Sequence, residues 1–428
     1  MSQSQKYVIP IVMVLLIAIS AVAGYFVGYN FGYNAALIQA PVVTTAPTAT
    51  TTPLKEAVKI GIMVPLSPPG DYKSGQIQLD AYRLGFKWVN DHGGVLGGRQ
   101  IVMIGPYDDQ GKPEIGVTMT RRLITDDGVA AIVAGWHSSV GLAQAKVANE
   151  LKTPLINPAS WTDEIPKLHS DYVFKIAVFN TEITLLMMPF LKQKAYKHIV
   201  FLGEDTDYGI DQGNSIETFL KSENIPYESF QKIIFPYDAV DFRSYLLQIK
   251  AMTPKPDVLI FAAVYQSMYL IPKQAKELGL YDMMDIIVGW DYPAWSPDWW
   301  EVAGEAGIGP IFPALFHPSL MTESGKEFQK AFKDAYGYDP SIYAFWAYDA
   351  IRVMADAIGR AGSTDREAIT DALKESRYAG CLGEIFFETD PEKWPAIWNQ
   401  WTGHILLMMQ YTEVKQKFED AKVVYTPL

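Results

Sequence analysis

The sequence predicts an α/β protein with two lobes, each a mostly parallel sheet that carries helices on both faces. Short apolar segments typical of strands alternate with amphipathic segments typical of helices, and repeated βα units of this kind specify parallel sheets. The predicted strands number roughly twice those of one open sheet. The chain of 428 residues is long enough for two domains. We therefore expect two similar lobes with a ligand cleft between them.

The expected elements follow one another from residue 58. Strands are expected at 58–65, 100–104, 129–134, 154–156, 172–176, 198–202, 225–234, 258–263 and 285–289. The helices between them are expected at 75–90, 113–125, 140–151, 181–194, 209–222, 242–252 and 265–278. Later segments indicate longer helices at 322–336, 343–361 and 365–375, then aromatic-rich strands at 384–387 and from 397 onward. Late elements that complete earlier lobes predict a hinge that the chain crosses several times.

The expected division of the chain has three parts. Residues 1–33 form a membrane anchor or signal segment, 34–55 a stalk rich in Thr and Pro, and 56–428 the bilobal ligand-binding domain. Within that domain, the first lobe is expected to comprise about 56–177 and 311–380, and the second about 178–310 and 381–428.

The N-terminal segment has the composition of a membrane span. No charged side chain occurs between Lys6 and Lys55, and Tyr7–Val27 is apolar over the about 20 residues that a bilayer-spanning helix needs. Ala21-Val22-Ala23 has the small-x-small form of a signal-peptidase site, so a cleaved signal peptide is the alternative. We favour a retained single-pass anchor in the cell membrane with the binding domain on the extracellular side. A cleaved signal would make the protein secreted.

Composition and motifs argue against several classes of function. The formal net charge of -12 is unfavourable for nucleic acid binding. The single cysteine, Cys381, cannot form an internal disulfide, and the six histidines show no metal-ligand spacing. Phosphate-binding loops, dinucleotide fingerprints and nucleophile elbows are all missing from the sequence. We therefore expect no cofactor, no metal and no enzymatic activity.

One predicted strand leads directly into a helix start that carries two hydroxyls. The strand is expected to end before Gly135, and Ser138 and Ser139 precede the helix expected at 140–151. The first amides of a helix lack intrahelical partners and, with the helix dipole, bind a carboxylate or phosphate. The same serines would also serve as helix caps alone.

Polar and aromatic residues follow several other predicted strands, where α/β folds place ligands. These segments are Asn157–Trp161, Glu204–Gly209, Val264–Ser267 and Gly289–Tyr292. Tyr208 and Tyr265 would equally suit packing between lobes, and Asp291 would equally suit a structural hydrogen bond.

A series of motifs in this order resembles the branched-chain amino-acid (Leu/Ile/Val-type) binding proteins of ABC importers. The series covers essentially everything from Val58 onward and consists of Gly61–Ser67, Asn90–Arg99, Tyr107–Gln110, Ser138-Ser139, Asn157-Pro158-Ala159, Asp207-Tyr208-Gly209 with Gly213, and Lys273–Gly279. The resemblance implies the type I periplasmic-binding fold.

The resemblance also implies site roles. The Ser139 hydroxyl and nearby amides would hold a ligand carboxylate, Ala159 would offer its backbone, and Tyr208 and Tyr265 would form walls. Asp291 would pair with the ligand ammonium. The expected ligand-binding set is Ser138, Ser139, Ala159, Ser160, Trp161, Tyr208, Tyr265 and Asp291.

This chain departs from the family pattern at three positions. Trp161 stands where the family usually has Thr or Ser, Asp291 replaces the commoner Glu, and Tyr72 is the candidate for a family aromatic ring near Ser74. These departures leave the fold expected and the ligand open.

The function expected from the sequence is extracytoplasmic capture of an amino acid, branched-chain or similar, by lobe closure and its delivery to the permease subunits of an ABC importer. The alternatives are a ligand-sensing ectodomain and a binding protein for urea or amide-type small polar solutes.

Overall fold

The computed structural model describes residues 56–296, 298–318, 321–389 and 397–427. The anchor or signal segment expected at 1–33 and the stalk expected at 34–55 lie outside these ranges. Within them, none of the helices combines the length and apolar character that a bilayer span requires.

The first sheet has five parallel strands in the order β2-β1-β3-β4-β5. Its strands are β1 Val58–Val64, β2 Ile101–Asp108, β3 Ala131–Ala134, β4 Leu155–Asn157 and β5 Val173–Lys175. Every residue of β3, β4 and β5 is buried. Strands covered on both faces read as continuous apolar runs, and the sequence shows such runs here.

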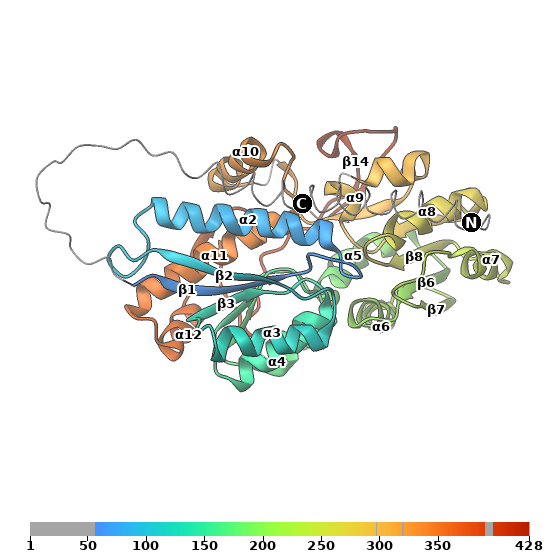
Figure 1. Cartoon of the computed structure of the whole chain (residues 1–428). Helices are drawn as coiled ribbons and strands as arrows, with labels where there is room; N and C mark the ends of the chain where they lie inside the picture. The colour runs from blue at the N-terminus through green and yellow to red at the C-terminus, as the bar shows by residue number, and fades with distance from the viewer. Residues whose placement is uncertain (1–55, 297, 319–320, 390–396, 428) are drawn as a thin grey trace, which may run out of the picture. The chain divides into compact units, whose positions relative to one another are not determined.

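Helices from distant parts of the chain cover this first sheet. α2 Tyr72–Asp91 and α11 Ile342–Ala361 pack together on one face, and α3 Pro113–Thr125 and α4 Ser138–Glu150 cover the other (Figure 1). A Cβ added at Gly85 would lie 2.9 Å from Cβ of Ile351, so glycine permits the close approach of α2 and α11. α10 Glu323–Tyr336 and α12 Arg366–Lys374 flank α2 and α11. We call this sheet with its helices the first lobe.

The second sheet has seven strands in the order β14-β13-β10-β9-β8-β6-β7. Five of them are parallel: β6 His198–Glu204, β7 Ser229–Phe235, β8 Val258–Ala262, β9 Asp285–Val288 and β10 Ile311–Ala314. At one edge, β13 Leu407–Gln410 pairs antiparallel with β10, and β14 Lys422–Tyr425 pairs antiparallel with β13.

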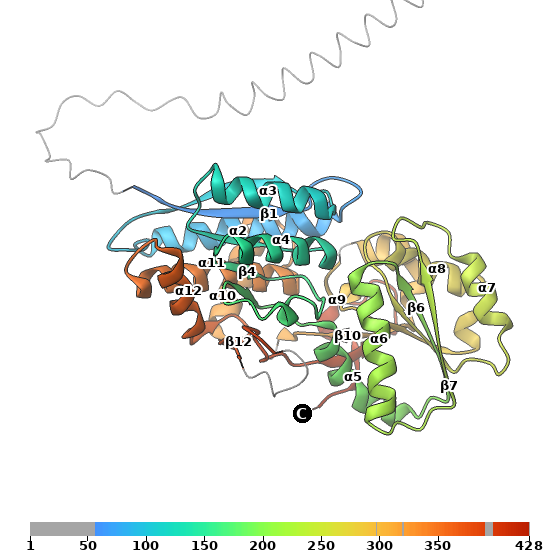
Figure 2. The same ribbon diagram turned by 90° about the horizontal axis from the view of Figure 1, so that it is seen from below.

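Helices also cover both faces of the second sheet. α5 Asn180–Lys194 and α6 Asp207–Ser222 lie on one side of β6, and α7 Arg243–Ala251 and α8 Ser267–Glu277 lie on the other (Figure 2). A short helix, α9 Tyr292–Trp295, follows β9. We call this sheet with its helices the second lobe. The two-lobed α/β architecture expected from the sequence is confirmed.

The chain passes between the lobes at places that differ in detail from the expected division. β10 Ile311–Ala314, expected in the first lobe, pairs with β9 and β13 of the second sheet. It is fully buried and takes the place beside the strand that precedes it in sequence, as consecutive strands usually do. Gln400, expected in the second lobe, forms a bridge to Lys175 at the edge of the first sheet. A small hairpin, β11 Tyr378–Gly380 with β12 Gly383–Ile385, lies between these crossings in sequence.

Candidate ligand-binding site

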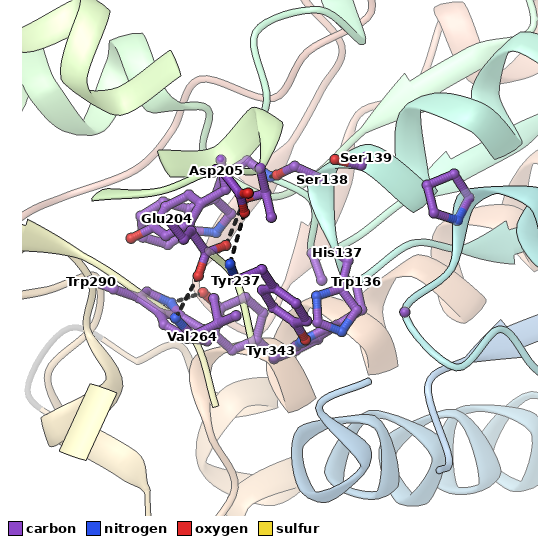
Figure 3. Close-up of a pocket in the computed structure, with 16 residues that line it drawn as sticks. Trp136, His137, Ser138, Ser139, Glu204, Asp205, Tyr237, Val264, Trp290 and Tyr343 are labelled. Atoms are coloured by element: carbon purple, nitrogen blue, oxygen red, sulfur yellow. Dashed lines mark hydrogen bonds between the residues drawn. The ribbon is translucent and has the colours of Figure 1, made fainter. Parts of the chain in front are cut away.

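A cavity of about 190 Å³ lies where the carboxyl ends of strands from both lobes face each other (Figure 3). Residues that follow β2, β3 and β4 line it from the first lobe, and residues at the ends of β6, β8 and β9 line it from the second. Ligands of open α/β sheets bind at this edge. The lining residues are Gly111, Pro113, Trp136, His137, Ser138, Ser139, Ala159, Trp161, Glu204, Asp205, Thr206, Tyr208, Tyr237, Val264, Trp290 and Tyr343.

The start of α4 forms one side of the cavity. Gly135 has φ 123°, and a Cβ there would lie 2.2 Å from Nδ2 of Asn157, so the turn into the helix requires glycine. Ser138 Oγ accepts hydrogen bonds from the amides of Trp161 and Thr162, both at 3.2 Å. Ser139 Oγ accepts one from the amide of Asp207 in the second lobe at 3.4 Å. Ser138 and Ser139 therefore hold the start of α4 to the loop after β4 and to the second lobe. They also mark a helix start whose dipole points at the edge of the cavity.

His137, at the N-cap of α4, contributes no positive charge to the cavity. Its Nε2 accepts a hydrogen bond from the amide of Asp71 at 3.1 Å, and its side chain makes no capping bond to the helix. Burial lowers the pKa of His137 to about 4. The imidazole is therefore neutral near pH 7.

The loop after β4 is held by Asn157. Asn157 Oδ1 accepts hydrogen bonds from the amides of Ala159 at 3.2 Å and Ser160 at 2.9 Å, and its Nδ2 donates to Ser160 Oγ at 3.0 Å. Ala159 and Trp161 line the cavity, whereas Ser160 turns its hydroxyl toward Asn157 and does not line it. Of the expected site residues in this loop, two therefore line the cavity and one does not.

Two carboxylates of the second lobe line the opposite side. Glu204 is 1% exposed, and its two oxygens accept hydrogen bonds from Thr206 Oγ1 at 2.6 Å and from the amide of Val264 at 3.0 Å (Figure 3). Burial raises the pKa of Glu204 to about 8, with those hydrogen bonds acting against the shift. Asp205 Oδ1 accepts a hydrogen bond from the amide of Tyr237 at 2.7 Å.

Five aromatic side chains, which we call the aromatic cage, form most of the remaining wall. Trp136, Trp161 and Tyr343 come from the first lobe, and Tyr208 and Trp290 come from the second. Neighbouring rings of the cage have centroid distances between 4.6 Å (Trp136 to Tyr343) and 6.3 Å (Tyr208 to Trp290). Trp161 Nε1 and the Tyr208 hydroxyl are buried without a hydrogen-bond partner among the described residues.

Asp291 lies next to the cage and outside the cavity lining. It is 0% exposed, and neither carboxylate oxygen has a hydrogen-bond partner within the part of the chain that the structure describes. Burial raises its pKa to about 8. Burial and then the nearby Asp291 charge raise the pKa of the Tyr343 hydroxyl. The carboxylate thus stands behind the ring wall, in electrostatic contact with it.

Tyr265 also lies outside this cavity. Its backbone is left-handed, with φ 54°, and its ring contacts Tyr72 with centroids 5.9 Å apart. The two tyrosines line a neighbouring cavity together with Lys73 and Asp298, which form an ion pair between the lobes. Of the expected set, Ser138, Ser139, Ala159, Trp161 and Tyr208 therefore line the main cavity, whereas Ser160, Tyr265 and Asp291 do not.

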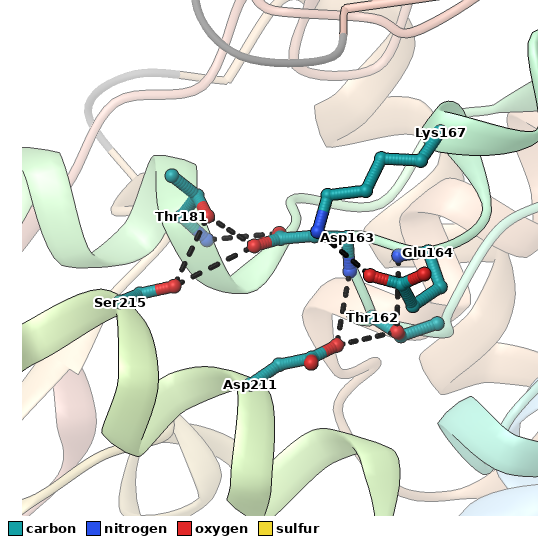
Figure 4. A network of polar contacts seen from close by, with 7 residues as sticks. All are labelled: Thr162, Asp163, Glu164, Lys167, Thr181, Asp211 and Ser215. Carbon is teal, nitrogen blue, oxygen red and sulfur yellow. Dashed lines mark hydrogen bonds and ion pairs between the residues drawn. The ribbon is translucent and has the colours of Figure 1, made fainter. Parts of the chain in front are cut away.

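A polar network joins the lobes beside the site (Figure 4). Asp211 on α6 accepts hydrogen bonds from Thr162 Oγ1 at 2.5 Å and from the amide of Asp163 at 3.3 Å. Asp163 accepts hydrogen bonds from the amide of Thr181 at 3.0 Å and from its hydroxyl. Since Trp161 precedes Thr162 directly, the network fixes one cage residue relative to the second lobe.

Some lining residues carried a sequence signal, and one did not. Trp136, His137, Glu204, Asp205 and Trp290 immediately follow or end strands, a position that marks them in retrospect. Tyr343 lies near the start of α11, far along the chain from the other lining residues, and no local pattern indicates its place.

Two facing α/β lobes with a small cavity at their strand ends define a bilobal solute-binding protein. A family model described as periplasmic binding protein matches residues 57–394, and the chain belongs to this family. The resemblance noted in the sequence is thereby confirmed.

Similar proteins agree with this family. The chain is 24% identical over 338 residues to Leu/Ile/Val-binding protein homolog 7 of Brucella abortus (strain 2308), an alignment that covers 75% of this chain and 82% of the relative. The structure superimposes with a TM-score of 0.73 on the leucine-binding protein LivK of Thermotoga maritima, at 23% identity, covering 87% of this chain and 99% of that one. The TM-score is also 0.73 for LivJ of Streptococcus pneumoniae in complex with isoleucine, at 21% identity and with 86% and 99% covered.

Proposed function

We propose that the protein is an extracytoplasmic solute-binding protein that captures an amino acid or a closely related zwitterion and delivers it to an ABC importer. The observation that carries the proposal is the cavity, which has a helix N-terminus on one side and carboxylates on the other. Such polarity suits a ligand with an acid end and a cationic end. The names of similar proteins support it, since homolog 7 is called Leu/Ile/Val-binding and LivJ was solved with isoleucine.

Capture would proceed by closure of the lobes. The cavity wall is shared between the lobes, so a ligand makes its full set of contacts only when they meet. Ser139 to Asp207 and Thr162 to Asp211 are contacts of the same kind within the protein. A ligand that binds the closed form more tightly shifts the population toward it, and a closed form is a state that a permease can distinguish.

Each of the expected site residues would have its own role in ligand binding. The first amides of α4 at Ser138 and Ser139 would hold the carboxylate, Ala159 would supply backbone contact, and Trp161 and Tyr208 would enclose the ligand body. Asp291 would act from behind the ring wall as the negative charge that compensates the ligand cation. Ser160 and Tyr265 would support the loop and the cleft entrance without touching the ligand.

The N-terminal segment would hold the binding domain at the outer face of the cell membrane. The apolar composition of Tyr7–Val27 supports an anchor, and the Thr-rich residues after it support a stalk. Membrane fractionation of the full chain and of a chain starting at residue 56 tests this. Equal release of both into the soluble fraction would contradict a retained anchor and favour a cleaved signal.

Ligand screening tests the binding function directly. Thermal unfolding of the purified protein is measured with each of the twenty amino acids and with urea and simple amides, and hits are titrated calorimetrically. At least one zwitterion is expected to raise Tm, because a ligand that binds only the folded state stabilises it. Binding of urea or amides alone would favour the alternative ligand class, and binding of none would contradict the proposal.

A further inference from the structure

The charge around the cavity is one-sided. Glu204 and Asp205 line it and Asp291 stands behind it, whereas none of the described lining residues is Lys or Arg. His137 is neutral because its Nε2 accepts a hydrogen bond from the amide of Asp71. Buried carboxylates without a partner cation are costly, and a ligand with a positive group would relieve that cost. None of the described lining side chains supplies a positive charge, so a positive charge at the site would come with the ligand.

The rings of the aromatic cage meet at steep angles, as the walls of a box do. Trp161 stands at 85° to Tyr208 and at 77° to Trp290, and Trp290 stands at 78° to Tyr343, with centroids 5.7 to 6.2 Å apart. The electron-rich faces of Trp and Tyr attract a cation within about 6 Å of the ring centre. Walls contributed by both lobes would surround such a cation only after closure.

Among the described side chains that line the cavity, the Tyr208 hydroxyl is the one buried acceptor without a hydrogen-bond partner, so a primary ammonium finds few free acceptors for its N–H groups. A primary ammonium has three donors to satisfy. Both oxygens of Glu204 and the hydroxyl of Ser138 already accept hydrogen bonds from the protein. A methylated ammonium carries its charge on methyl groups, needs fewer acceptors or none, and is weakly hydrated, so ring faces suit it better.

We propose that the ligand is a small zwitterion whose positive end is an N-methylated ammonium group enclosed by the aromatic cage, with its carboxylate at the first turn of α4. This inference rests on the proposed function and specifies the class of ligand. The cavity of about 190 Å³ is somewhat larger than the about 150 Å³ apolar cavity that holds benzene, so the ligand is compact. Cation–π attraction, with Glu204 in the cavity wall and Asp291 next to the rings, supplies the selectivity.

Matched pairs of ligands test the inference on the full-length protein. Glycine, alanine, valine and leucine are each titrated beside their N-trimethyl derivatives. 3,3-Dimethylbutanoate, which has the same carboxylate but an uncharged tert-butyl end, serves as the shape analogue of N-trimethylglycine. We expect at least one N-trimethyl compound to bind tenfold or more tightly than its parent. We expect 3,3-dimethylbutanoate to bind at least tenfold more weakly than N-trimethylglycine, because only the trimethyl end differs in charge.

The outcomes separate the inference from the proposed function. If a parent amino acid binds more tightly than every methylated compound, the inference is wrong and the proposed function stands. If 3,3-dimethylbutanoate binds as well as N-trimethylglycine, shape alone selects the ligand and the cation cage is refuted. If none of the compounds binds, the inference is contradicted, and the screen of the twenty amino acids decides the proposed function separately.

Variants of the cage give a second readout. Trp290→Phe keeps a ring face and is expected to retain affinity within about fivefold, whereas Trp290→Leu keeps apolar volume without the face and is expected to lose tenfold or more. Trp136→Leu repeats the test from the first lobe, and circular dichroism checks that each variant folds. Trp398→Leu removes an indole that donates to Ser170 O away from the cavity and should leave affinity unchanged. Equal affinity of Trp290→Phe and Trp290→Leu for the methylated ligand would overturn the cage.

Discussion

Two buried aspartates in this molecule have opposite surroundings. Asp349 in α11 has Arg352 Nη1 at 3.3 Å and accepts a hydrogen bond from the amide of Cys381 at 2.7 Å. Asp291, equally buried, has no partner for either oxygen among the residues described. Burial raises the pKa of Asp349 only to about 6, because Arg352 opposes the shift, and raises that of Asp291 to about 8.

Aromatic rings accompany both aspartates. The Arg352 guanidinium lies over three rings, with centroid distances of 4.4 Å to Trp88, 4.9 Å to Tyr348 and 5.2 Å to Tyr378. The rings beside Asp291 enclose a cavity instead. In both of these places the chain brings an acid and rings together, and among the described residues it supplies the cation beside Asp349 but not beside Asp291. The comparison supports the proposal that a ligand completes the second place.

The largest effect on stability is expected from breaking the cluster of Asp349 and Arg352. Arg352→Met leaves Asp349 buried without its cation, which is expected to lower the free energy of unfolding by about 3–5 kcal/mol. Urea unfolding followed by circular dichroism measures this. Arg352→Lys keeps the charge but loses the planar contact with the rings. Its free energy of unfolding should therefore lie between those of the parent and Arg352→Met. A loss below about 1 kcal/mol in Arg352→Met would show that the two clusters do not differ as described.

Removing the unpaired charge should act on binding and spare stability. Asp291→Asn is expected to weaken ligand binding by about 2–5 kcal/mol, because the ligand cation would lose its buried counter-charge. Without ligand, the variant should be as stable as the parent or more so, since an unpaired buried carboxylate is removed. Calorimetric titration and urea unfolding give the two numbers. Unchanged affinity together with a loss of stability would make Asp291 a structural residue.

The pH dependence of stability should also differ between the parent and Asp291→Asn. Asp291 has an ordinary pKa of 3.8 and a folded pKa of about 8, so between these values the folded state holds more protons than the unfolded state. The contribution of Asp291 to stability therefore falls as pH rises from about 4 to about 8, and this part of the pH profile should be absent in Asp291→Asn. Unfolding midpoints across this range measure the difference. Identical profiles for parent and variant would contradict the assigned pKa.

Ligand binding adds a second pH effect of opposite sign. A cationic ligand favours the ionised forms of Asp291 and Glu204, whose folded pKa values are both about 8. Binding near pH 7 should therefore release protons, and affinity should increase as pH rises toward 8. Titration calorimetry in buffers with different ionisation enthalpies counts the protons. Proton uptake on binding would be incompatible with a cation at this place.

The smallest effect is expected in the network between the lobes. Thr162→Val removes the hydrogen bond to Asp211 without changing side-chain size greatly, and should weaken ligand binding by about 0.5–1.5 kcal/mol through a less stable closed form. Small-angle scattering should show a more open average without ligand. Thr218→Val, at an exposed position of the same helix α6, is the matched control. An equal effect of both variants would exclude a role in closure.

Sequence periodicity predicted the fold well because its signals are local. Parallel strands buried on both faces read as apolar runs, and the helices that cover them show helical spacing, so β1 to β9 were all expected near their observed places. The expected place of Ile311–Ala314 in the first lobe differs from the structure, because the sequence of a short buried strand does not indicate which sheet it joins. That choice depends on pairing with β9 and β13.

The candidate site was predictable where it follows strand ends and uncertain where side-chain direction decides. Trp290 and Asp291 are adjacent after β9, and neighbouring side chains near a strand end diverge, so one lines the cavity and the other does not. Tyr265 adopts a left-handed backbone that brings its ring to Tyr72. Tyr343 reaches the cavity only through the packing of α11 on α2, which the sequence near it does not encode.

The cage has a practical consequence for anyone measuring this protein. Trp136 and Trp161 each lie within 6.2 Å of Trp290, so three indoles share one small space. A guest that enters between them should alter their emission and their near-ultraviolet dichroism. Trp88, stacked on His92 and covered by Arg352, belongs to the other cluster, so a guest in the cage should leave its surroundings unchanged. The protein therefore carries its own optical reporter of occupancy, with no added dye.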